Sequence, residues 1–113
     1  MVNSRNKGAQ GEREWARWLR EELGVKDARR GVQHSGGPNS PDVLGVDGVH
    51  WEVKRVEKLN LQSAMEQAIR DCGVNIPVVA HRKNRGEWLM TLRADDVIKF
   101  CMAIKAAYDD SRT

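Results

Sequence analysis

Apolar side chains recur with the period of an α-helix in two segments of the chain. Residues 8–23 place four large apolar side chains on one helical face, namely Trp15, Trp18, Leu19 and Leu23. Residues 60–72 carry a second apolar stripe, which runs from Leu61 to Cys72. Gly24 and Gly73 follow these segments, where a glycine commonly ends a helix. The pattern therefore predicts two amphipathic helices.

A third helical pattern covers residues 94–108. Asp95 and Asp96 suit its first turn, because negative charge stabilises a helix N-terminus. We expect four of its side chains to be buried: Val97, Cys101, Ile104 and Tyr108. Cys72 lies on the apolar stripe of the preceding helix, and neither cysteine has a CxxC partner. Both cysteines are therefore interpreted as small buried hydrophobic residues.

Five shorter segments have the composition of β-strands. They are residues 28–34, 42–46, 49–56, 76–81 and 87–92. The fourth is a continuous apolar run, which is typical of a strand covered on both faces. With the three helices, the element order is α-β-β-β-α-β-β-α. This order predicts a mixed β-sheet flanked by helices, in an α/β or α+β domain.

The remaining segments are polar and lack a regular pattern. Residues 1–7 are expected to form a mobile basic arm, and residues 35–41, rich in Gly, Ser and Pro, are predicted to form a loop. No linker divides the chain, so residues 1–113 are expected to fold as one domain. No apolar run approaches the ~18 residues of a membrane span, and no apolar segment follows the N-terminus. We therefore expect a cytosolic protein.

The charge balance permits a nucleic-acid partner without requiring one. Lys and Arg number 19 against 16 Asp and Glu, a net charge of +3. The basic residues cluster at several positions, among them Arg13/Arg17/Arg20, Arg29/Arg30, Lys54/Arg55/Lys58 and Arg82/Lys83/Arg85. Each cluster taken singly is also compatible with an ordinary solvated surface.

Charged side chains gather on one face of the strand predicted over residues 49–56. His50, Glu52 and Lys54 alternate with Val49, Trp51 and Val53, so the two sets point to opposite faces. The apolar set is expected to face the core. The polar set is compatible with a solvent-exposed face of the sheet, or with a reactive site beside the Gly-rich loop.

The hairpin register decides whether Asp42 joins Glu52. A two-residue turn at Asp47-Gly48 would direct the two carboxylates to opposite faces. A three-residue loop over residues 46–48 would pair Gly45 with Val49 and place Asp42 opposite Glu52, with Gly48 at positive φ. Cross-strand neighbours lie ~5 Å apart at Cβ. Two carboxylates this close suit a hard cation such as Mg²⁺.

Glu12 continues the apolar face of the first helix, seven residues before Leu19. A carboxylate on a buried stripe needs a partner. The partner could be an arginine, the helix N-terminus, or a metal ion shared with Asp42 and Glu52. The pattern leaves these alternatives open.

Four motifs in order resemble the PD-(D/E)xK nucleases, most closely the archaeal-type Holliday junction resolvases and related small phage and prophage nucleases. They are Gly8-Ala9-Gln10-Gly11-Glu12-Arg13-Glu14, Ser35-Gly36, Pro41-Asp42 and Glu52-Val53-Lys54. The likeness covers roughly residues 8–56, and residues 78–92 look like the late hairpin of the small phage members. It implies a restriction-endonuclease-like α/β fold and a Mg²⁺- or Mn²⁺-dependent endonuclease.

The resemblance also implies a role for each motif residue. Asp42 and Glu52 would bind the metal ion, with the Val53 carbonyl oxygen as a further ligand. Lys54 would position the attacking water and stabilise charge on the phosphate, and Glu12 would complete the acidic cluster directly or through water. Phosphodiester hydrolysis needs these two contributions, a metal-bound nucleophile and neutralised charge.

The same resemblance suggests which residues meet DNA. Ser35 would contact the scissile backbone, and Gln67 matches a glutamine that some members direct at the site from the following helix. The basic residues expected to follow the backbone are Arg29, Arg30, Arg55, Arg82 and Lys83. The implied substrate is branched DNA, such as a four-way junction, cut by a homodimer. The alternatives are a nicking or structure-nonspecific phage endonuclease, or a catalytically silent DNA-binding module.

Overall fold

Five strands form one mixed sheet in the order β1-β2-β3-β4-β5, in a computed structural model that describes residues 4–31 and 41–113. The strands are β1 (Arg29–Arg30), β2 (Val43–Leu44), β3 (Val49–Arg55), β4 (Ile76–Arg82) and β5 (Leu89–Leu92). β3 and β4 are parallel, and the other neighbours are antiparallel. The parallel pair is joined through α2 (Leu61–Asp71), as a parallel pair requires a long crossover. The predicted mixed sheet and element order are confirmed.

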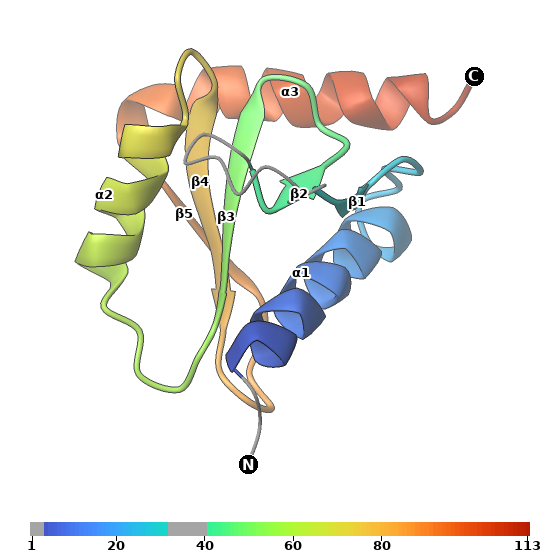
Figure 1. Cartoon of the computed structure of the whole chain (residues 1–113). Helices are drawn as coiled ribbons and strands as arrows, with labels where there is room; N and C mark the ends of the chain where they lie inside the picture. Colours follow the sequence, from blue (N-terminus) through green and yellow to red (C-terminus); the bar gives the residue numbers. More distant parts are fainter. Residues whose placement is uncertain (1–3, 32–40) are drawn as a thin grey trace.

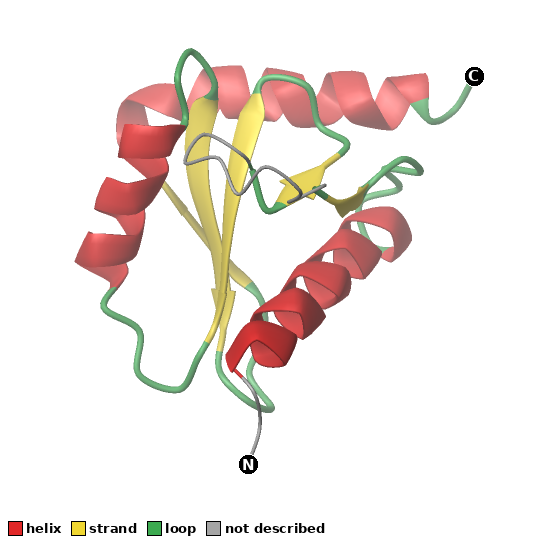
Figure 2. Cartoon of the chain, viewed as in Figure 1, coloured by secondary structure: helices red, strands yellow, loops and turns green. Residues whose placement is uncertain are grey.

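Helices cover both faces of this sheet (Figures 1 and 2). α1 (Ser4–Glu21) and α3 (Val97–Asp110) contribute to one apolar core, and α2 packs on the other face against Val79. A short 3₁₀ turn, η1 (Ala94–Asp96), leads into α3. The chain is thus an α/β domain in its described residues. None of the described helices combines the length and apolar character needed to cross a membrane.

Aromatic rings fill the larger core. Trp15 stacks on Trp18 at 4.9 Å between centroids and meets Trp51 edge-on at 5.2 Å. Trp51 in turn meets Phe100 of α3 edge-on at 5.9 Å. Trp15 and Trp51 are fully buried. Since each aromatic ring buries a large apolar area, this cluster holds α1 and α3 against β3.

The start of α1 differs from its prediction, and the start of α2 agrees with its prediction. α1 begins at Ser4, so residues 4–7, expected in the mobile arm, continue the helix instead. Residues 1–3 lie outside the described residues. α2 begins where the pattern places it, because the Asn60 side chain accepts a hydrogen bond from the Ser63 N–H at 3.0 Å.

The predicted buried face of α3 is wrong for three of its four residues, while Ile104 is partly buried against the core as predicted. Val97, Cys101 and Tyr108 are exposed, whereas Phe100 and Ala107 are buried. Apolar residues occupy more than one side of this helix, so several stripes fit a helical period equally well, and contact with Trp51 selects the stripe that contains Phe100. The interpretation of Cys72 as buried is confirmed, and that of Cys101 is corrected.

The β2–β3 connection has the register of the three-residue loop. Val43 pairs with Trp51, which is the register that also opposes Asp42 to Glu52. Gly48 has φ +87° and Gly45 has φ +128°. A Cβ at Gly48 would meet no atom within 4 Å, whereas one at Gly45 would lie 2.6 Å from the Ala28 Cα. The predicted register and the positive φ of Gly48 are confirmed. The turn itself is centred on Asp47-Gly48, because the Val49 N–H donates to the Val46 carbonyl at 3.2 Å. Gly45, also at positive φ, is required by close packing on Ala28.

Replacing these two glycines should separate backbone strain from steric overlap. Gly48→Ala introduces only the strain of a positive φ, so it should lower the free energy of unfolding by about 1–2 kcal/mol. Gly45→Ala adds overlap with the Ala28 backbone and should cost more. Urea denaturation of both variants checks the order. An equal or reversed order would contradict this account of the hairpin.

Candidate functional site

Asp42 lies directly before β2 and is bound to the middle of β3. Its backbone N–H donates to the Trp51 carbonyl at 3.0 Å. Its side-chain Oδ2 accepts a hydrogen bond from the Val53 N–H at 2.8 Å. The carboxylate therefore takes part in joining the two strands, and its position follows from the hairpin register.

Glu52 occupies a buried position on the same strand, with 5% of its surface exposed. Its Oε1 lies 3.6 Å from Nε2 of His50, which is also buried, and its Oε2 lies 3.9 Å from Nζ of Lys54. The three residues share one face of β3, as the alternation predicts. That face is not solvent-exposed, because α2 packs against it.

Several charged groups around Asp42 act on the pKa of its carboxyl group. The pKa of Asp42 is raised from 3.8 to about 7, chiefly by burial, then by the nearby Glu52 carboxylate, with a smaller contribution from Glu12. The hydrogen bond from Val53 and the charge of Lys54 oppose the shift. Asp42 and Glu52 therefore form a pair of mutually repelling carboxylates with little solvent around them.

Lys54 is held by the neighbouring helix. Its Nζ donates a hydrogen bond to Oε1 of Gln67 in α2 at 3.3 Å. Both side chains are half-buried. Gln67 therefore faces the candidate site.

Glu12 has an arginine as its partner. Arg30 Nε donates to Glu12 Oε1 at 3.0 Å, and the Glu12 side chain is 12% exposed. Within residues 4–31 and 41–113, no three or more His, Cys, Asp or Glu side chains group closely enough to hold a metal ion. A role for Glu12 at the metal ion, directly or through water, stays a prediction.

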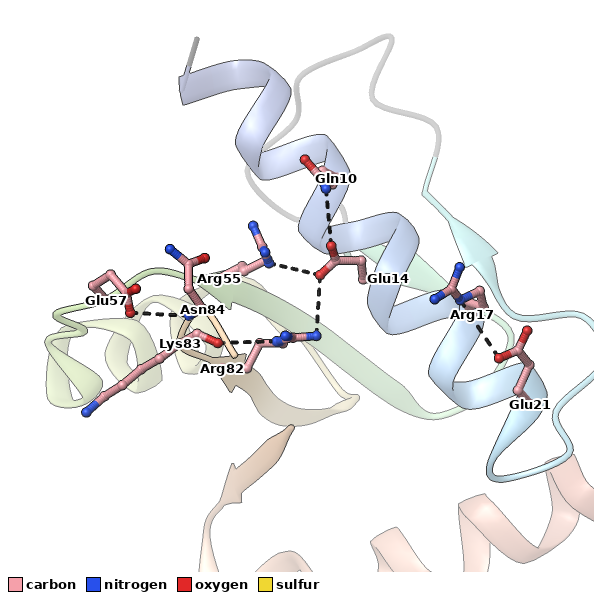
Figure 3. A network of polar contacts seen from close by, with 9 residues as sticks. All are labelled: Gln10, Glu14, Arg17, Glu21, Arg55, Glu57, Arg82, Lys83 and Asn84. Carbon is pink, nitrogen blue, oxygen red and sulfur yellow. Dashed lines mark hydrogen bonds and ion pairs between the residues drawn. The ribbon is translucent and has the colours of Figure 1, made fainter. Parts of the chain in front are cut away.

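Sequence reasoning missed a second charged group, centred on Glu14 (Figure 3). Its Oε2 lies 2.9 Å from Nε of Arg55 and 3.8 Å from Nη1 of Arg82, and Gln10 donates to its Oε1 at 3.3 Å. All three charged side chains are mostly buried. The group joins α1 to the ends of β3 and β4, so Arg55 and Arg82 have structural partners.

Gly11, a glycine inside the predicted first helix, is a sequence feature that indicates this close contact of α1 with β3. A Cβ there would lie 3.1 Å from the Arg55 Cβ, so α1 approaches β3 closely at this point. A glycine in the interior of a helix is a common mark of such an approach.

The other expected DNA contacts have varied surroundings. Arg29 and Lys83 are exposed, and Arg29 Nη1 donates to the Asp27 carbonyl at 2.8 Å. Ser35 lies outside the described residues. Contact of these residues with DNA stays a prediction.

The donor chemistry of Asp42 and Glu52 fits a hard divalent cation. Both supply carboxylate oxygens, the ligands that Mg²⁺ and Mn²⁺ prefer. Burial and their mutual repulsion together raise the pKa of Asp42, and a bound cation would favour the charged form of both carboxylates.

Comparison with known proteins gives no match to a family model, to a curated protein or to a solved structure. The functional interpretation therefore rests on the site geometry and on the motif resemblance.

The raised pKa of Asp42 predicts a pH-dependent stability. The folded value of about 7 exceeds the ordinary value of 3.8, so the folded state binds more protons between these pH values. This contribution makes the unfolding free energy fall as pH rises through that window. Asp42→Asn retains an acceptor for Val53 but carries no charge. In EDTA at pH 8 it should exceed the wild type in unfolding free energy by an amount on the order of 2 kcal/mol.

Denaturant titrations at pH 4 and pH 8 measure this difference. The gain should shrink at pH 4, where Asp42 is protonated. Asp47→Asn is the matched control, because Asp47 is exposed in the same hairpin. If Asp42→Asn were less stable than the wild type at pH 8, the charged, buried carboxylate of Asp42 would not be destabilising as we expect.

Proposed function

We propose that this protein is a metal-dependent endonuclease of the PD-(D/E)xK superfamily, which hydrolyses phosphodiester bonds in DNA. The observation that carries the proposal is the pairing of Asp42 with Glu52, beside Lys54. Two adjacent carboxylates and a lysine supply metal binding and charge stabilisation, the two requirements of this reaction.

The arrangement of the motifs supports a restriction-endonuclease-like fold. Pro41-Asp42 directly precedes β2, and Glu52-Val53-Lys54 lies within β3, an interior strand of the mixed sheet. β4 and β5 form an antiparallel pair over the region that resembles the late hairpin of the small phage nucleases.

A Mg²⁺ or Mn²⁺ ion held by Asp42, Glu52 and the Val53 carbonyl oxygen would supply a polarised water and positive charge at the phosphate. The protein's own residues provide the rest. Lys54 presents an ammonium group beside the carboxylates and stabilises negative charge as it develops on the phosphate. Gln67 orients Lys54 through its hydrogen bond.

Neighbouring side chains also limit the orientation of Glu52 and the charge of Glu12. Glu52 is enclosed beside His50, which limits the directions its carboxylate can take. Arg30 forms an ion pair with Glu12 and thereby neutralises part of its negative charge.

The proposed substrate is branched DNA, with a four-way junction as the specific candidate. Symmetric cleavage of a junction requires two active sites, so the proposal includes a homodimer. A nicking or structure-nonspecific endonuclease uses the same chemistry and is distinguished by its substrate alone. Incubation with a synthetic junction, a linear duplex and supercoiled plasmid separates these possibilities.

Asp42→Asn should abolish cleavage of these substrates. The change removes an anionic ligand and leaves the packing around it intact. The measurement is cleavage in Mg²⁺ and in EDTA, with Asp47→Asn as the active control. DNA binding by the variant should persist.

Full cleavage by Asp42→Asn at saturating Mg²⁺ would refute the site. DNA binding by the wild type without any metal-dependent cleavage would instead identify the silent binding module.

Lys54→Ala should reduce turnover by a factor of about 10²–10³, because its positive charge acts on the transition state. Metal affinity should be retained. Lys58→Ala is the matched control, since Lys58 is exposed in the loop after β3. Single-turnover cleavage across a Mg²⁺ titration separates the two effects. Weakened metal affinity with unchanged turnover at saturation would make Lys54 a structural residue.

A further inference from the structure

A basic groove lies between α1 and β1, with a volume of about 470 Å³. Its lining includes one acidic residue, Glu14, and five arginines. The arginines are Arg13, Arg17, Arg20, Arg29 and Arg30. Only the last two of these arginines were expected to meet DNA from the sequence. The groove is therefore a larger basic surface than the separate clusters indicate.

Three of the arginines form a stripe along α1. Arg13, Arg17 and Arg20 follow the i, i+4, i+7 spacing of one helical face, and all three are exposed. Trp15 and Leu19 occupy the opposite, buried side of the same helix. Packing of the tryptophans thus directs the basic stripe outward.

The positive charge of the groove is compensated only in part, because Arg30 pairs with Glu12 while other arginines keep their charge. The carboxylate of Glu14 is engaged by Arg55 and Arg82, which lie outside the groove lining. Arg20 donates to the Ala28 carbonyl at 2.8 Å, a contact that positions the guanidinium without neutralising it.

Arg17 pairs with Glu21 at 3.8 Å, but both side chains are about two-thirds exposed, so the pair contributes little. Arg13 has no ion-pair partner among the described residues. The groove therefore retains a strong attraction for an anion.

Contacts of Arg30 and Gly31 link the groove to the candidate site. Arg30 lines the groove, pairs with Val43 of β2 and binds Glu12, whose charge acts on Asp42. The adjacent Gly31 N–H donates to the Asp42 carbonyl at 2.9 Å. One end of the groove therefore lies next to the segment that carries Asp42.

We infer that this groove binds the phosphate backbone of duplex DNA to one side of the bond that is cut. The inference rests on the proposed function, from which it takes the ligand. At ~1.5 Å per residue, Arg13 to Arg20 spans ~10 Å, about three nucleotide steps of ~3.4 Å. Guanidinium groups suit this role because they donate to phosphate oxygens in a bidentate manner.

The double variant Arg13→Gln/Arg17→Gln tests the groove. A labelled duplex is titrated in EDTA over a series of salt concentrations, which measures binding without cleavage. Each lost phosphate contact lowers the salt slope by about 0.9, so the double variant should lose about two units and bind more weakly throughout.

The matched control is Lys99→Gln/Lys105→Gln on α3. It removes the same charge, and Lys105 forms an i,i+4 pair with Asp109, as Arg17 does with Glu21. Its slope should equal that of the wild type. Circular dichroism establishes that both double variants are folded.

Two outcomes would refute DNA binding by the groove and nothing else. They are an unchanged salt slope in the arginine double variant, or an equal loss of salt slope in both double variants. In either case metal-dependent cleavage by the wild type would leave the proposed function standing. A wild type that neither binds nor cleaves DNA would overturn both proposals.

Discussion

The register between β2 and β3 is the constraint on which the candidate site depends. β2 has only two residues, so its pairing is held by a few contacts: the Val43–Trp51 pair, two glycines at positive φ and the hydrogen bond from Val53 to Asp42. A shift by one residue would reverse the faces of its side chains. The meeting of Asp42 with Glu52 is therefore a property of the hairpin.

α1 relates the core to the charged surfaces. Its tryptophan side fixes the helix on the sheet, and from that fixed position Glu14 reaches Arg55 and Arg82. Glu12, two residues earlier, reaches Arg30. Because these acids are engaged by arginines of the sheet and its edge, the outward arginines of the same helix remain available for a ligand.

The sequence predicts local structure correctly where a residue pattern is compatible with a single backbone conformation. Gly48 after Asp47 specified the hairpin, and strict alternation placed Glu52 with Lys54. The prediction failed on α3, where apolar residues on several sides allowed more than one buried stripe and only contact with Trp51 selects Phe100. The arginine partner of Glu12 and the group around Glu14 join distant segments, so no local pattern could decide them.

The hydrogen bond between Asp42 and Val53 has a consequence for the history of such a chain. Asp42 serves the fold as well as the proposed chemistry, because it accepts a hydrogen bond from the backbone of β3. Lys54 is half-buried, and its ammonium group contacts the side chains of Gln67 and Glu52. If selection for cleavage were relaxed, substitutions at Lys54 would be tolerated first, and position 42 would keep a side chain that accepts the hydrogen bond from Val53. Among descendants of this chain, the lysine would be the more informative record of retained activity.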